Sequence, residues 1–140
     1  MEQVVKQVDV VKEAARVMKQ LMEPREFVRN GKTLKENKLT TSQIRKFLIA
    51  VNTVTNKINV YKSKHLGQKL LSDELAAEVQ YLKVKIVYQA GRENTVRKFV
   101  DASHILDYVD AVGNDIATYD TLSRYVEALV AYHKFYGGKD

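Results

Sequence analysis

Residues 40–61 read TTSQIRKFLIAVNTVTNKINVY, and this stretch decides the class of the fold. Thr40 followed three residues later by Gln43 matches a capping box, which predicts that a helix begins here. Apolar side chains then recur every three or four residues, on one stripe of a helix. The stripe consists of Ile44, Phe47, Val51, Val54, Ile58 and Tyr61, and the opposite face carries Arg45, Asn52, Asn56 and Asn59. The stretch therefore predicts a long amphipathic helix.

The same periodicity predicts one helix before this stretch and three after it. The first helix ends at Pro24, and the third begins at Ser72 with acids in its first turn. The fourth runs from about Asn94 to Gly113, and Asp120 is the expected N-cap of the fifth. Their expected core stripes are Val4, Val8, Val11, Ala15, Met18 and Met22; Leu75, Val79, Leu82 and Ile86; Phe99, Ala102, Leu106 and Val109; and Leu122, Val126, Leu129, His133 and Tyr136.

Two basic connections separate these helices. The first covers about residues 24–40 and contains the turn signal Asn30-Gly31, and the second covers about residues 62–71. Strand-like alternation is scarce, and the 140 residues include one proline and six glycines. We therefore expect an all-α five-helix bundle that forms a single domain over residues 1–140.

The net charge of +6 is concentrated in one part of the chain. Residues 25–69 contain 11 basic and only 2 acidic side chains, whereas residues 71–140 carry a charge of −3. A local excess of this kind attracts polyanions, because each neutralised phosphate releases a condensed counterion. A lysine-rich surface that maintains solubility is the alternative explanation.

The sequence offers little for catalysis or for binding a metal or cofactor. There is no cysteine, and His65, His104 and His133 lie far apart without a metal-ligand spacing. No Walker loop, Gly-x-Ser-x-Gly or Gly-x-Gly-x-x-Gly motif occurs. We expect no enzymatic activity, no cofactor and no metal. No secretion signal or membrane-spanning run is evident, so a cytoplasmic location without membrane contact is expected.

Nucleic-acid binding fits the basic region better, in a form that contacts the backbone. A major-groove reader needs a short helix-turn-helix, whereas the second and third helices are separated by a long loop. Tracking a phosphodiester backbone requires only cations and amides on one side of a bundle. The second helix and its flanks supply Lys38, Arg45, Lys46, Asn52, Asn56 and Lys57.

Two further segments allow two interpretations each. In residues 88–94, YQAGREN, Gly91 either ends a helix in the left-handed conformation or lets another backbone come close. Arg92 either complements the helix dipole or contacts phosphate. In the last helix, Tyr125, Tyr132, Phe135 and Tyr136 form either a protein interface or part of the chain's own core.

The segments Tyr88-Gln89-Ala90-Gly91-Arg92-Glu93 and residues 125–140, YVEALVAYHKFYGGKD, together resemble the small α-helical Csm subunit of type III-A CRISPR effector complexes. The likeness spans roughly residues 40–140, and the part before Thr40 matches only loosely. His133 departs from the pattern, since another aromatic is expected there, and this weakens an apolar interface role at that position.

This resemblance implies a non-catalytic protein whose copies stack along the complex beside the backbone subunits. It also implies that they contact the guide–target RNA duplex and help hold it for cleavage by other subunits in antiviral defence. The implied partners are guide RNA, target RNA, the backbone and large Csm subunits, and further copies of the chain. The predicted RNA contacts are Arg45, Lys46, Lys57, Lys83, Arg92 and Arg97; the predicted subunit contacts are Tyr132, Lys134 and Tyr136. Alternatives are a stand-alone helical nucleic-acid-binding regulator and a small ribonuclease.

Overall fold

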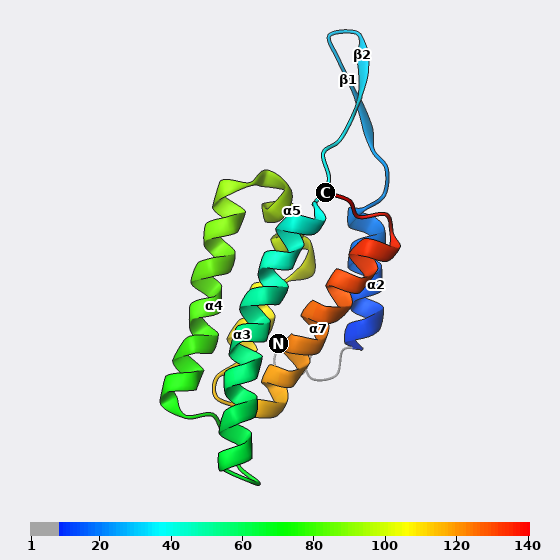
Figure 1. Cartoon of the computed structure of the whole chain (residues 1–140). Coiled ribbons are helices and arrows are strands. Elements are labelled where there is room, and N and C mark those ends of the chain that lie inside the picture. Colours follow the sequence, from blue (N-terminus) through cyan, green and yellow to red (C-terminus); the bar gives the residue numbers. More distant parts are fainter. Residues whose placement is uncertain (1–8) are drawn as a thin grey trace.

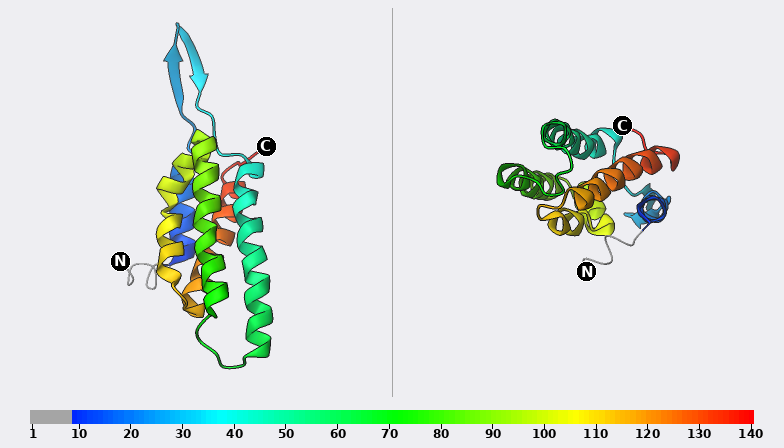
Figure 2. Two further views of the ribbon diagram at one scale, coloured as in Figure 1. Left: turned by 90° about the vertical axis from the view of Figure 1, so that its left-hand side faces the viewer. Right: turned by 90° about the horizontal axis from the view of Figure 1, so that it is seen from below.

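The computed structural model describes residues 9–140 as an elongated helical bundle from which a β-hairpin projects (Figures 1 and 2). Within these residues six helices and two strands are formed, in the order α2 (Val10–Leu21), β1 (Glu26–Arg29), β2 (Lys32–Lys35), α3 (Thr41–Lys64), α4 (Asp73–Arg92), α5 (Asn94–Ser103), α6 (Ile105–Val112) and α7 (Ile116–Phe135). The mainly helical class is confirmed, but the expected count of five helices is wrong. Val4 and Val8 lie outside the described residues.

Local capping chemistry explains where several helices begin. The Thr40 hydroxyl accepts a hydrogen bond from the Gln43 backbone amide, and the Gln43 side-chain oxygen accepts one from the Thr40 backbone amide, so the predicted capping box is present. The Ser72 side chain caps α4 through the amide of Leu75. Helix α7 begins at Ile116 with Asp115 as its N-cap, so the expectation that Asp120 opens this helix is wrong.

The segment expected as one helix from Asn94 to Gly113 is two helices, α5 and α6. His104 separates them with a left-handed φ of 55°. The buried side chains shift phase across this residue: Val96, Phe99, Val100 and Ser103 precede it, and Ile105, Tyr108, Val109 and Val112 follow. A straight helix could not turn both sets inward, so the break at His104 keeps both stripes in the core.

Gly91 does not end α4. The helix continues through Arg92, and the chain turns at Glu93, whose backbone is extended. Gly91 therefore has ordinary helical geometry, and a Cβ added to it would meet no atom within 4 Å. The interpretation of Gly91 as a left-handed helix end is wrong.

The two basic connections also differ from expectation. The first contains the hairpin, with Asn30 and Gly31 at its turn, both at positive φ. This combination matches the tight turns that suit the twist of two antiparallel strands. The second is shorter than predicted, because α3 continues to Lys64.

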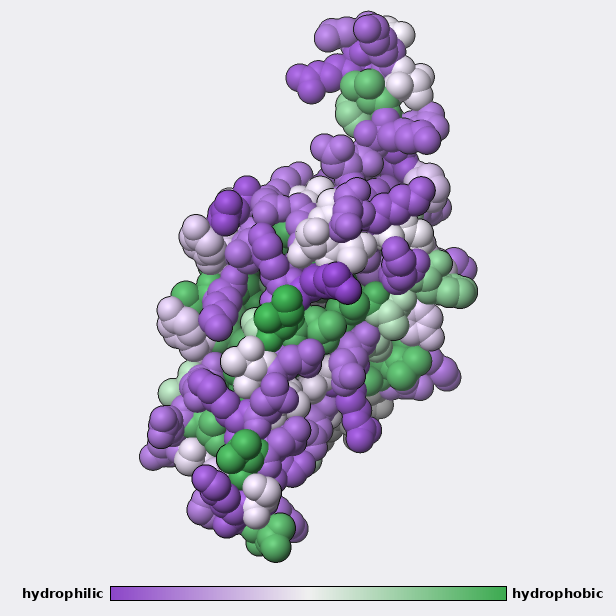
Figure 3. Space-filling model, viewed as in Figure 1, coloured by the Kyte–Doolittle hydropathy of each residue, from purple (hydrophilic) through white to green (hydrophobic). Residues whose placement is uncertain are grey.

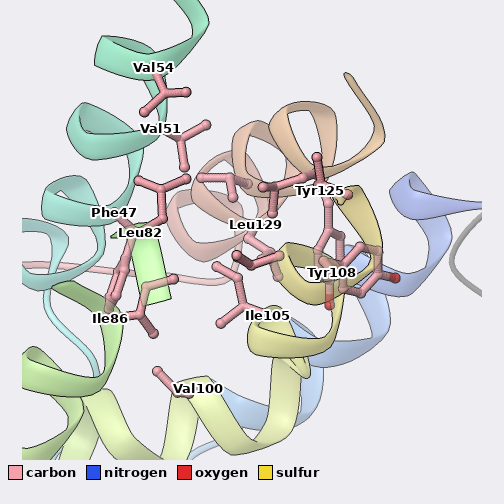
Figure 4. Close-up of a cluster of buried hydrophobic side chains, with 14 of the residues drawn as sticks. Phe47, Val51, Val54, Leu82, Ile86, Val100, Ile105, Tyr108, Tyr125 and Leu129 are labelled. Atoms are coloured by element: carbon pink, nitrogen blue, oxygen red, sulfur yellow. The ribbon is translucent and has the colours of Figure 1, made fainter. Parts of the chain in front are cut away.

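The hydrophobic core centres on α7, which packs against α2, α3 and α6. Its inward residues Tyr119, Leu122, Tyr125, Val126 and Leu129 are almost completely buried. The rings of Tyr125 and Tyr108 stack with their centroids 4.1 Å apart (Figure 4). Since α7 touches elements that are far apart in sequence, it holds the bundle together.

Three polar groups of α7 reach backbone carbonyls on other segments. The Tyr119 hydroxyl donates to the Val51 oxygen at 2.9 Å, and the Tyr125 hydroxyl donates to the Ser103 oxygen at 2.8 Å. Nε2 of His133 lies 2.7 Å from the Leu39 oxygen; a carbonyl can only accept, so this nitrogen carries the proton. Burial raises the pKa of Tyr119 to about 12 and also raises that of Tyr125, so both phenols remain neutral donors at physiological pH.

Substitution of Tyr125 tests this arrangement. Tyr125→Phe removes the donor from the Ser103 carbonyl at the α5–α6 break while keeping the ring, so we expect a loss of about 1–3 kcal/mol in the free energy of unfolding, measured with urea. The control Tyr81→Phe alters an exposed ring and should change stability by less than about 0.5 kcal/mol. Equal values for the two variants would contradict the role of Tyr125.

Two glycine substitutions test whether α4 continues through Gly91, with Gly113, which lies outside α4, for comparison. Gly91→Ala should raise the free energy of unfolding by up to about 1 kcal/mol, because alanine favours a helix and nothing obstructs its methyl group. Gly113→Ala should lower it by about 1–2 kcal/mol, since Gly113 has a φ of 54°. Destabilisation by Gly91→Ala would show that the helix does end there.

Candidate nucleic-acid interface

Gln43 ties three helix ends together at one end of the bundle. Its Oε1 atom accepts from the Thr40 amide at 2.9 Å and from the Thr95 hydroxyl at 3.0 Å, and its Nε2 atom donates to the Glu93 carboxylate. The start of α3 is therefore joined to the point where α4 gives way to α5. Side chains that project from these three helix ends are held on one rigid junction.

Four of the six predicted RNA contacts belong to this junction. Arg45 and Lys46 lie near the start of α3, Arg92 is the last residue of α4, and Arg97 lies in α5 close to its start. All four are exposed, and none forms an ion pair with a carboxylate of residues 9–140. We call these four residues the basic junction surface.

The other two predicted contacts lie away from the junction and are already paired. Lys57 Nζ is 2.5 Å from Glu78 Oε1, and Lys83 Nζ is 2.6 Å from Asp110 Oδ1. These pairs join α4 to α3 on one side and to α6 on the other. A phosphate would have to compete with a carboxylate at both lysines, which makes them weaker candidates than the junction residues.

Arg92 lies over an aromatic ring. Its guanidinium carbon is 5.5 Å from the centroid of the Tyr88 ring, one helical turn earlier in α4. Stacking of this kind restricts the side chain while leaving its N–H groups available, because a guanidinium donates hydrogen bonds in its own plane. The exposed position suits contact with an anion, and the lone basic residue in the last turn also complements the helix dipole.

The β-hairpin is a functional candidate that sequence analysis missed. Phe27 pairs with Leu34 and, nearer the turn, Arg29 pairs with Lys32, so one face has an apolar base and a cationic tip. All eight strand residues are exposed, and Figure 3 shows a small apolar patch on an otherwise hydrophilic arm. Asn30-Gly31 between Phe27-Val28 and Thr33-Leu34 is the sequence signal that could have revealed it.

A groove separates the base of the hairpin from the start of α5. It has a volume of about 570 Å³ and is lined in part by Phe27, Lys35, Lys38, Asn94 and Lys98. Lys98 Nζ also pairs with Glu36 Oε1 at 2.8 Å, which joins the arm to the bundle. The hydrogen bond from Lys98 lowers the pKa of Glu36. The groove thus connects the junction to the hairpin, and its lining carries Glu36 and Glu93 as well as lysines.

The predicted subunit contacts lie at the end of α7. Tyr132 and Tyr136 are partly buried against the core, whereas the neighbouring Phe135 is 75% exposed and packs edge-on against the Tyr136 ring at 5.0 Å. Lys134 is exposed and donates to the Gly138 carbonyl at 3.4 Å. Phe135 is therefore the most accessible aromatic of this cluster.

His133 takes no part in that surface. It is 1% exposed and bonded to Leu39, and a Cβ on Gly138 would collide with its ring. The His133 ring packs against Gly138, where a side chain would leave no room for it. Packing therefore explains why position 133 holds a histidine instead of the expected aromatic residue.

Residues 9–140 contain no group of three or more histidine, aspartate or glutamate side chains arranged to hold a metal ion. None of the helices described is long and apolar enough to cross a membrane.

Comparison with known proteins links the chain to one family. Residues 15–139 match the family model described as Csm2 Type III-A. A Streptococcus thermophilus protein named CRISPR system Cms protein Csm2 is 43% identical over 110 residues, which cover 76% of this chain and 83% of the relative. Proteins of the same name from Enterococcus italicus and Mycobacterium tuberculosis are 37% and 33% identical, over 80% and 73% of this chain and 85% and 78% of the relatives.

Proposed function

The chain belongs to the type III-A Csm2 family, and from this premise we propose that it is a non-catalytic subunit of a CRISPR ribonucleoprotein that contacts the RNA backbone. The resemblance carried by residues 88–93 and 125–140 is confirmed at the level of the family. The match begins at residue 15, so it also covers most of α2 and the hairpin, which the resemblance included only loosely.

The basic junction surface is the observation that carries the proposal. Arg45, Lys46, Arg92 and Arg97 project from three helix ends that Gln43 joins, and none of the four forms an ion pair with a carboxylate of residues 9–140. A rigid group of exposed cations attracts phosphates, and counterion release favours their binding. The groove beside the junction adds Lys35 and Lys38, although it also contains Glu36 and Glu93, and Arg29 and Lys32 place two further cations near the hairpin tip.

Contact with the guide–target RNA duplex, without base reading, fits this surface best. An A-form duplex exposes phosphates and a wide, shallow minor groove with 2′-hydroxyls. Cations at the junction suit the phosphates, and the exposed amides of Asn52 and Asn56 along α3 suit hydroxyls. Holding the duplex in this way would present the target strand to catalytic subunits of the complex.

The aromatic end of α7 is the proposed contact with neighbouring subunits. Phe135 is exposed beside the partly buried Tyr132 and Tyr136, and the exposed Lys134 adds a cation. Exposed aromatic side chains supported by a packed base are typical of interface anchors. We therefore assign the backbone and large Csm subunits, and further copies of the chain, to protein surfaces distinct from the basic junction surface.

Charge reversal at the junction tests RNA contact. We expect the isolated chain to bind single-stranded RNA weakly. The variants Arg45→Glu and Arg92→Glu, alone or combined, should reduce the slope of log K against log salt by about 1–2, because fewer phosphates are neutralised. Fluorescence anisotropy of a labelled RNA over a salt series measures this slope. Circular dichroism checks that both variants remain folded.

The matched control is Lys12→Glu on α2, which alters an exposed cation away from the junction. If the control lowers the slope as much as the junction variants, net charge alone explains binding and the assigned residues are wrong. Co-purification tests the wider proposal: the chain should be recovered from cells with a guide RNA and larger Csm proteins, and recovery of the chain alone would contradict it.

A further inference from the structure

Both long edges of the β-hairpin are open. Within residues 9–140 the sheet consists of β1 and β2 alone, and Figures 1 and 2 show the two strands projecting beyond the helices with no segment of the described chain alongside. All eight strand residues are exposed. A two-stranded hairpin is at best marginally stable in water by itself, so an arm of this kind gains stability when a further strand joins it.

The hydrogen bonds of the hairpin show which backbone groups point outward. The Glu36 amide donates to the Arg25 carbonyl at 2.9 Å, so these opposed residues form a hydrogen-bonded pair. Such pairs alternate with pairs whose N–H and C=O groups point away from the opposite strand. In the register of this hairpin, the outward-pointing pairs are Glu26 with Lys35 and Val28 with Thr33. The open edge of β2 therefore presents the amides and carbonyls of Thr33 and Lys35.

The two edges differ in charge. Strand β2 carries Lys32 and Lys35 and no acidic residue, whereas in β1 the cation Arg29 is accompanied by Glu26. Lysines along an open edge oppose pairing with another copy of the same strand, because like charges then meet. The same lysines favour a strand that carries carboxylates.

The groove at the base of the hairpin gives such a strand room to continue. Its lining includes residues 35–38, which follow on from β2, and Asn94, Thr95 and Lys98 of α5, whereas Phe27 is its only residue from β1. The groove therefore opens beside the β2 edge. Because Glu36 and Glu93 also line it, the acidic part of an added strand belongs along β2 and not in the groove.

We propose that the open edge of β2 binds an extended acidic segment of another protein as a third strand of the sheet. The backbone of the segment pairs with the outward groups of Thr33 and Lys35, as in other peptides that add a strand to an exposed edge. Side chains of a strand alternate between its two faces. Carboxylates therefore lie beside Lys32 on one face and beside Lys35 on the other, and an apolar side chain lies beside Leu34. This binding site is separate from the basic junction surface and goes beyond the proposed function.

A protein strand satisfies more of the β2 edge than RNA does. A phosphate group only accepts hydrogen bonds, so it can meet the outward amides of Thr33 and Lys35 but not their carbonyls. A strand carries both donors and acceptors along its backbone. Phe27 and Leu34, which are 45% and 39% exposed, also gain from burial against apolar atoms.

Two proline variants test which edge is used. The probe is a fluorescent peptide that contains Glu-Val-Thr-Glu, which in antiparallel pairing sets a glutamate opposite Lys35 and Lys32 and the valine opposite Leu34. Thr33→Pro removes an outward amide without breaking the hairpin ladder. It should raise the dissociation constant, measured by anisotropy, about tenfold or more, because a hydrogen bond is lost and the ring obstructs the edge. The matched control Val28→Pro alters the opposite edge in the same way and should change the constant less than about twofold.

Hydrogen exchange followed by NMR tests backbone pairing directly. The amides of Thr33 and Lys35 should exchange rapidly in the free chain and become protected when the peptide binds, whereas the amide of Val28 should stay unprotected. Peptide binding without protection at Thr33 and Lys35 indicates attraction by charge alone and contradicts the added strand.

A charge exchange tests the preference for acidic partners without altering the backbone. Lys32→Glu combined with Lys35→Glu should abolish binding of the Glu-Val-Thr-Glu peptide and permit binding of a Lys-Val-Thr-Lys peptide. Circular dichroism confirms that the bundle of each variant remains folded.

Three results would overturn the proposal. The first is a wild-type chain that does not bind the acidic peptide, and the second is an equal loss of affinity in Thr33→Pro and Val28→Pro. The third is protection of Thr33 and Lys35 by single-stranded RNA but not by the peptide, which identifies the edge as an RNA surface. The Arg45 and Arg92 variants measure RNA contact at the junction separately, so each of these results leaves the proposed function standing.

Discussion

The fold depends on the hydrogen bonds that the buried polar groups of one central helix make to backbone carbonyls elsewhere in the chain. Helix α7 has polar tips at Tyr119, Tyr125 and His133, and each must find a partner away from water because an unmet buried donor costs more than a hydrogen bond is worth. Each finds a backbone carbonyl on a different element: Val51 in α3, Ser103 at the end of α5, and Leu39 before α3. Apolar packing would tolerate small slips of α7, but three hydrogen bonds to fixed carbonyls specify its position.

This constraint extends to the basic end of the molecule. Leu39 directly precedes the capping box that starts α3, so the His133 contact places Thr40 and Gln43 relative to α7. The segment after His133 adds to it, because the Lys139 carbonyl accepts from the Thr41 amide and the Asp140 carboxylate accepts from Ser42. Gln43 then fixes the start of α3 relative to α4 and α5 through its hydrogen bonds with Glu93 and Thr95. The exposed arginines of the junction are therefore held by buried groups on a distant part of the chain.

Short sequence patterns correctly predicted those features of the fold that a few adjacent residues determine. Thr40 and Ser72 start helices as expected, and the α3 stripe is buried from Ile44 to Ile58, because capping and periodicity are properties of a few adjacent residues. Tyr61, the last residue of the expected stripe, is only partly buried. The break at His104 depends on which faces the rest of the bundle covers, although the phase shift from Val100 to Ile105 is visible in the sequence. At the candidate site, the sequence showed which residues are cationic but not which of them are paired with a carboxylate. The partners of Lys57 and Lys83 lie 21 and 27 residues away in the sequence, and only the fold brings them together.

A cationic surface and an apolar surface contribute differently to the binding of a subunit. Under the proposed function, cations at the junction would attract any RNA backbone, and salt would weaken this attraction. They would supply affinity but no sequence preference and little choice of position. Apolar stripes and aromatic anchors act only where a complementary shape is present, and salt affects them much less. Exposed side chains of this kind are Tyr81, Val84 and Tyr88 on α4 and Phe135 on α7. Under the proposed function, these apolar side chains would place the chain among other subunits more than its net positive charge would.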